Sequence, residues 1–149
     1  MKNIHRSIRV LHGFVGIGAL AGGLAGMLNP LEPMGIPAET LQHAPFSTFL
    51  IPGIILFTVI GMGNMGGLIM SVLRPRFSGY SSCIAGGALA IWIVVQCVMF
   101  RDVVMLHIIY LIIGIAQGLL GSAVLVIYRQ FPASLVMRIL GIIRSEEKR

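Results

Sequence analysis

Charged residues are scarce in this chain of 149 residues: 11% of the positions are Asp, Glu, Lys or Arg, whereas 56% are hydrophobic. A soluble domain carries about 25% charged residues, so the composition excludes an ordinary water-soluble protein. The formal net charge of +6 would suit a protein that binds nucleic acid, but few charges fall within the long apolar runs. We therefore predict no nucleic-acid partner and interpret the basic excess as a signal of membrane topology.

Cysteine is equally scarce, and both cysteines, Cys83 and Cys97, lie in one apolar segment. On a helix they would be about 21 Å apart, too far for a disulfide. This excludes a disulfide scaffold, and the lack of a Cys-x-x-Cys pair excludes quinone-linked thiol oxidation. No long apolar run contains Asp, Glu, Lys or Arg, so we do not expect proton-coupled export through a membrane carboxylate. His12 is the only ionisable group in the first run.

Four apolar stretches are long enough to cross a bilayer, because a spanning helix needs about 20 mostly apolar residues. They are Val10 to Leu28, Phe46 to Leu73, Ser82 to Phe100, and Val103 to Tyr128. The predicted fold class is all-α, with four transmembrane helices in an up-down bundle over residues 1–128. Residues 129–149 are expected to form an interfacial amphipathic helix and a basic tail.

Basic residues predict the orientation, since Lys and Arg accumulate on the cytoplasmic side of a membrane. With both termini in the cytoplasm, ten of the eleven Lys and Arg residues are cytoplasmic and only Arg101 is external. The predicted location is the bacterial cytoplasmic membrane. The alternative is a signal peptide that is cleaved near Ala19-Leu20-Ala21, which would leave three spans.

The spans carry small residues at four-residue spacing, which lets helix backbones approach closely in a membrane. We expect these faces to make contacts within the chain, and we expect Gly22→Leu or Gly118→Leu to disrupt the bundle. Association of copies through a remaining face, or with a larger membrane partner, is the alternative. The positions are Gly18, Gly22, Gly26, Gly63, Gly67, Gly86, Ala90, Gly114, Gly118 and Ser122.

Polar residues of the fourth span fall on one face at heptad spacing, with His107, Tyr110 and Gln117 in a stripe. Polar side chains avoid lipid, so this stripe should face the bundle interior. Asn64 of the second span lies at a comparable depth, and we predict a hydrogen bond between Asn64 and Gln117. Because such a bond is weak in membrane proteins, Gln117→Leu should leave insertion intact.

Further polar residues gather toward the external end of the spans. Glu39 and His43 lie in a proline-rich loop, Trp92 and Gln96 share a face of the third span, and Arg101 and Asp102 follow it. If the loop folds over the bundle, these groups surround an external mouth. Their spacing is not that of a metal site, so we predict no metal, no cofactor and no catalytic residue.

Five groups of spaced positions stand out along the chain: Leu11-His12-Gly13, Pro45-Phe46-x-x-Phe49-Leu50-Ile51-Pro52-Gly53, Gly61 with Asn64, Trp92-Ile93-x-x-Gln96, and His107-x-x-Tyr110-x-x-x-Gly114. In these positions the chain resembles a family of small bacterial four-helix membrane proteins that has no established activity. The resemblance covers all four spans. It implies the fold and a bacterial membrane location, and it implies no mechanism.

The leading functional hypothesis is a non-catalytic membrane protein that binds or shields a hydrophobic or amphiphilic molecule, as an accessory or protective factor. Its expected partners are membrane lipids and that molecule, bound near Trp92, Gln96, His107, Tyr110, Gln117 and Asn64. One alternative is a small transporter or channel with a neutral path past Asn64, Gln117 and Tyr110. Another is a membrane enzyme that uses His43, Asp102 and His107.

Overall fold

The computed structural model describes residues 2–139, and these residues form helices and connecting loops without any strand. Four helical segments are long and apolar enough to cross a membrane. The first is α1 (Lys2–Leu28), and the second is a continuous helix made of α2 (Leu50–Ile55), the π-helical segment η3 (Leu56–Met62) and α3 (Gly63–Leu73). The third and fourth are α4 (Ser78–Phe100) and α5 (Met105–Ile127). The predicted all-α four-helix class is confirmed.

Two of the helix boundaries that differ from the predicted spans are the start of α1, which includes basic residues, and the start of the second helix, which lies close to Pro52. Helix α1 extends eight residues before Val10, through its basic first turns, and passes Ala19-Leu20-Ala21 without a break. The second helix begins at Leu50 and not at Phe46. Pro52 therefore lies in the first turn, where a missing N–H leaves no intrahelical hydrogen bond unmade.

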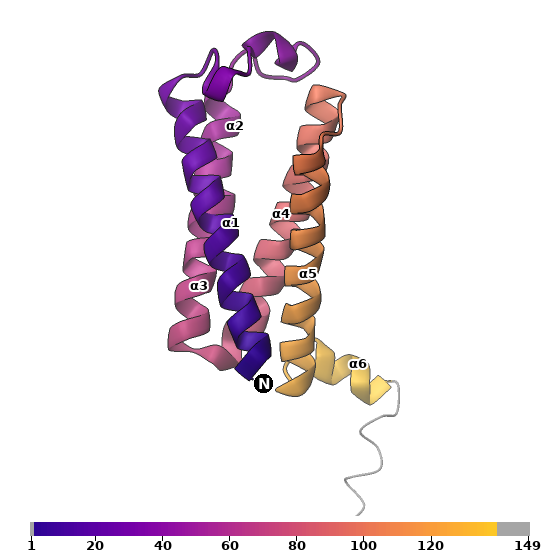
Figure 1. The fold of residues 1–149 in the computed structure, drawn as a ribbon. Coiled ribbons are helices and arrows are strands. Elements are labelled where there is room, and N and C mark those ends of the chain that lie inside the picture. Colours follow the sequence, from indigo (N-terminus) through magenta and orange to yellow (C-terminus); the bar gives the residue numbers. More distant parts are fainter. Residues whose placement is uncertain (1, 140–149) are drawn as a thin grey trace, which may run out of the picture.

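The bundle consists of two tightly packed helix pairs, α1 with α2–η3–α3 and α4 with α5 (Figure 1). Lipid tails are as apolar as leucine, so helix association in a membrane depends on close packing between small residues. In the second pair, a Cβ atom added to Gly86 would lie 2.5 Å from the carbonyl oxygen of Gly114. In the first pair, a Cβ atom on Gly53 would lie 3.1 Å from the Cα of Gly26.

The glycines in contact are only partly those that the spacing predicted. A Cβ atom on Gly118 or Gly63 would meet no atom within 4 Å, and one on Gly22 would meet only the Leu56 side chain at 3.3 Å. These contacts argue against the expectation that Gly22→Leu or Gly118→Leu disrupts the bundle. Four-residue spacing identifies a helix face that is made of small residues, but it does not show whether that face meets the neighbouring helix.

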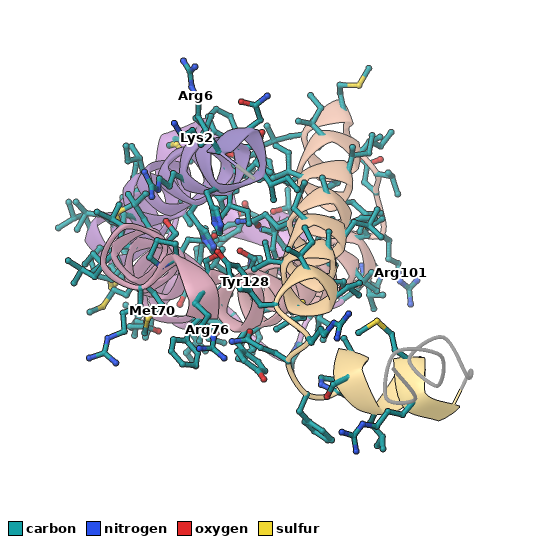
Figure 2. All side chains as sticks on the ribbon, turned by 90° about the horizontal axis from the view of Figure 1, so that it is seen from below. Lys2, Arg6, Met70, Arg76, Arg101 and Tyr128 are labelled. Carbon is teal, nitrogen blue, oxygen red and sulfur yellow. The ribbon has the colours of Figure 1, made fainter. Side chains whose placement is uncertain are left out.

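The two ends of the bundle differ, and we call them the terminal end and the loop end. The terminal end holds the start of α1, the end of α5 and the short helices η4 (Pro75–Phe77) and α6 (Ala133–Ile139) (Figure 1). Seen from this end, Lys2, Arg6 and Arg76 lie at the outer edge of the bundle (Figure 2). Helix α6 extends away from the bundle here, where the interfacial helix was predicted; residues 140–149 of that prediction lie outside the described residues.

Candidate functional site

The segment between α1 and α2 folds over the loop end of the bundle. It contains the 3₁₀ helices η1 (Pro33–Gly35) and η2 (Ala38–Leu41). Leu41 is 1% exposed and packs with Phe49 against Met99 near the end of α4. The ring centroids of Phe49 and Phe100 are 6.0 Å apart. This apolar cluster holds the proline-rich loop across the end of the bundle, which is the condition under which the sequence placed an external mouth there.

Beneath this loop the two helix pairs enclose a cavity of about 670 Å³. Pockets that bind small molecules measure about 300–1,000 Å³ and are mostly apolar. Every spanning segment contributes to the wall, including the π-helical segment through Leu56 and Ile60. The wall residues from the helices are Val15, Gly18, Ala19, Gly22, Gly26, Pro52, Gly53, Leu56, Ile60, Leu89, Trp92, Ile93, Gln96, Met99, Phe100, Leu106, His107 and Tyr110.

Four of the predicted site residues lie in the cavity wall: Trp92, Gln96, His107 and Tyr110. Helices α4 and α5 are antiparallel and touch at Gly86 and Gly114. Trp92 lies six residues beyond that contact and Tyr110 lies four, about 9 Å and 6 Å toward the loop end. The two aromatic side chains are therefore at similar depth. Tyr110 also stacks on Phe14 of α1 and places its hydroxyl against Gly18.

His107 is buried and helps to begin α5. The backbone N–H of Val104 donates a hydrogen bond to His107 Nδ1 over 3.3 Å, and the ring stacks on Phe100 with a centroid separation of 6.0 Å. Because Nδ1 accepts this bond it carries no proton, and the ring proton resides on Nε2. His107 therefore contributes a hydrogen-bond donor to the cavity wall.

The predicted mouth residues are divided between two places. His43, Arg101 and Asp102 are exposed and line the opening of the cavity. Arg101 has a left-handed backbone with φ of 50° at the end of α4, and Asp102 Oδ1 accepts a hydrogen bond from the N–H of Val103 over 2.8 Å. Glu39 lines a separate depression on the outside of the loop. Glu39 is therefore not among the residues that line the cavity.

Asn64 and Gln117 lie outside the cavity, in a buried polar cluster nearer the terminal end. Gln117 Nε2 donates to Asn64 Oδ1 over 2.8 Å, so the predicted hydrogen bond is confirmed. The centre of this cluster is His12, which is 0% exposed. Its Nδ1 is 2.9 Å from Asn64 Oδ1 and its Nε2 is 3.1 Å from Ser82 Oγ. Each of the four spanning segments thus provides one member.

The donor and acceptor types of the groups determine the direction of three hydrogen bonds in the cluster. Asn64 Oδ1 can only accept, so His12 Nδ1 must carry the proton that it donates. Asn64 Nδ2 donates to the carbonyl of Ile60 over 2.8 Å, which fixes the orientation of the amide. In the neutral ring His12 Nε2 then accepts from the hydroxyl of Ser82. The cluster holds the two helix pairs together by directional bonds.

An apolar layer separates this cluster from the cavity. Val15 is one turn nearer the loop end than His12, and Ile60 is one turn nearer than Asn64. Both side chains, together with Leu89, are no more than 2% exposed and form the cavity floor. The alternative hypothesis of a transporter or channel assumed one path past Asn64, Gln117 and Tyr110, whereas the structure divides these residues between a closed polar cluster and an open cavity.

Comparisons with models of protein families, with curated proteins and with solved structures gave no match to this chain. The site must therefore be interpreted from its own geometry. Within residues 2–139, no group of three or more His, Cys, Asp or Glu side chains has an arrangement that could hold a metal ion. The chemistry of the wall is that of hydrogen bonding and apolar contact.

Proposed function

We propose that this membrane protein binds a hydrophobic or amphiphilic molecule in the cavity at the loop end of its helix bundle. The observation that carries the proposal is the cavity itself, about 670 Å³ between two helix pairs. The bilayer around a membrane protein consists of apolar lipid chains. Lipid-like compounds are therefore the natural occupants of an apolar cavity of this size. The role is accessory or protective, because binding removes the molecule from the bilayer.

Three further features support a binding role. The helix pairs separate where the cavity lies and meet where the polar cluster lies, so the space is a consequence of the fold. The π-helical segment Leu56–Met62 contributes to the wall, and π-helical insertions frequently occur at functional sites. The exposed apolar residues Met34, Val104 and Leu106 share the opening with the exposed polar residues His43, Arg101 and Asp102, which suits entry of an amphiphilic molecule from the bilayer.

Gly22→Leu tests the binding role, because the new side chain would project from the cavity wall. The added Cβ atom meets only the flexible Leu56 side chain at 3.3 Å, so we expect a folded protein with a filled cavity. The native mass spectrum of the wild-type protein in mild detergent should contain the chain with a bound molecule of lipid-like mass. Gly22→Leu should reduce the bound fraction at least fivefold.

Gly118→Leu is the matched control, since the same substitution is made where an added Cβ atom meets nothing within 4 Å and outside the cavity lining. Its bound fraction should equal that of the wild type. A wild-type spectrum of the bare chain alone, or equal bound fractions in Gly22→Leu and wild type, would contradict the proposed function.

We further propose that the terminal end faces the cytoplasm of a bacterium and that the cavity opens toward the external leaflet. The support is the charge distribution: Lys2, Arg6, Arg9, Arg74, Arg76, Arg129 and Arg138 belong to the terminal end, and Arg101 belongs to the loop end. A reporter that is active only in the cytoplasm should be active when fused after Arg149. An inactive fusion with correct insertion would reverse the orientation.

A further inference from the structure

We infer that the molecule in the cavity is an uncharged single-chain lipid that carries a carbonyl oxygen. This inference rests on the proposed function and specifies the ligand of the same site. It follows from the volume of the cavity, from the hydrogen-bond donors in its wall and from the position of the charged groups.

The volume limits the size of the ligand. A water molecule takes about 30 Å³ in the liquid, so a cavity of 670 Å³ has room for about 20 groups of that size. One long hydrocarbon chain with a small polar group fits this number. A diacyl phospholipid, with two such chains and a headgroup, is too large.

The wall offers donors that the protein leaves unused. Trp92 is 7% exposed, and its indole Nε1 is buried without a hydrogen-bond partner in the described structure. An indole N–H can only donate, and a buried donor without a partner costs about 1–3 kcal/mol. His107 adds a second donor to the wall, because its Nδ1 already accepts from Val104 and the ring proton is on Nε2. The unpaired Trp92 N–H is the group that requires an acceptor from the ligand.

Two neighbouring groups extend this polar part of the wall. Gln96 lies one turn from Trp92 on α4, and Tyr110 lies at the depth of Trp92 on α5. Within residues 2–139, neither side chain has a hydrogen bond to the protein. A carbonyl oxygen has two lone pairs and so can accept from two of these groups at once.

The charges favour a neutral ligand over a carboxylate. Among residues 2–139, Arg101 is the only Arg or Lys that lines the cavity, and it is exposed at the mouth beside Asp102. A carboxylate in the apolar interior would have no cation of its own, and an unpaired buried charge is very unfavourable. A ketone, ester or quinone carbonyl needs only the donors that are present.

The test compares three probes of nearly equal length in native mass spectra of the full chain in mild detergent: 2-nonadecanone, eicosane and nonadecanoate. The wild-type protein should bind the ketone at least fivefold more tightly than the alkane, because one neutral hydrogen bond corresponds to about a fivefold change in affinity. Trp92→Phe should lower ketone affinity about fivefold and alkane affinity less than twofold. Tyr110→Phe is a second variant with the same expectation should Trp92→Phe fail to fold.

Tyr80→Phe is the control, because it removes a hydroxyl that bonds to the carbonyl of Phe131 away from the cavity. It should leave the ratio of ketone to alkane affinity unchanged. Equal binding of ketone and alkane, or tighter binding of nonadecanoate, would overturn the carbonyl inference and leave the binding role intact. Binding of none of the three probes would overturn both.

Discussion

Gly86→Leu should separate α4 from α5 and destabilise the protein by about 3 kcal/mol, the upper end of the range for overpacking. The Cβ atom of any new side chain would lie 2.5 Å from the Gly114 carbonyl oxygen and 2.7 Å from the Gly118 nitrogen. These are backbone atoms, which cannot move aside without moving the helix. The expected result is a clearly lower midpoint of thermal unfolding in detergent than for the wild type.

Gly87→Leu provides a matched control on the same helix. Gly87 is exposed, and an added Cβ atom there meets nothing within 4 Å. Its unfolding free energy should stay within about 0.5 kcal/mol of the wild type, as for surface substitutions in general. Equal midpoints for Gly86→Leu and Gly87→Leu would show that close backbone contact does not join α4 to α5.

His12→Leu should have the second largest effect, a loss of about 2 kcal/mol. The substitution removes both ring nitrogens and so breaks the bonds to Asn64 and Ser82 while leaving those partners buried. Each hydrogen bond between helices contributes about 0.6 kcal/mol to the stability of a membrane protein on average. Buried partners that are left without a hydrogen bond add to the cost of the substitution. The measurement is the free energy of unfolding in mixed micelles.

Two comparisons isolate the role of His12. Gln117→Leu should cost about 1 kcal/mol or less and leave insertion intact, because Asn64 Oδ1 retains the bond from His12. His43→Leu should be nearly neutral, since His43 is exposed in the loop. If His12→Leu proved as harmless as His43→Leu, the polar cluster would not hold the helix pairs together.

Much of the fold could be predicted from the sequence because the membrane restricts the alternatives. The apolar runs predicted four spanning helices, and in the predicted stripe on α5 His107 and Gln117 are buried whereas Tyr110 is half-buried. The bond between Asn64 and Gln117 followed from their depth and their need for partners. The length of the apolar runs, the helical periodicity and the rule that polar side chains avoid lipid were sufficient for these predictions.

The centre of the polar cluster was missed, although a signal was present. His12 is the only ionisable residue in the apolar part of α1, and an ionisable residue in a membrane helix is a site hypothesis by default. Its position in the first apolar run did not reveal which polar groups of the other helices it contacts. Ser82 was taken as the edge of a span, because the sequence does not show that α4 begins four residues earlier, at Ser78.

The division between cavity and cluster depends on tertiary packing. Gly22 and Gly23 are adjacent in the sequence, yet a Cβ atom on Gly23 would lie 2.6 Å from the backbone nitrogen of Phe57, whereas one on Gly22 meets a side chain. The crossing of α1 and the second helix decides which glycine faces a backbone and which faces the cavity. The four-residue spacing singled out Gly22, whereas the close backbone contact is at Gly23.

The most direct measurement uses Trp92, which is the only tryptophan and lies in the cavity wall. Its fluorescence in detergent should be quenched by methyl 9,10-dibromostearate, and quenching should saturate near one equivalent. The signal should persist in Gly118→Leu and lose its saturable part in Gly22→Leu. Quenching that rises without saturation, to the same degree in Gly22→Leu and the wild type, would contradict the account, because the probe would then be dissolved around the bundle and not bound inside it.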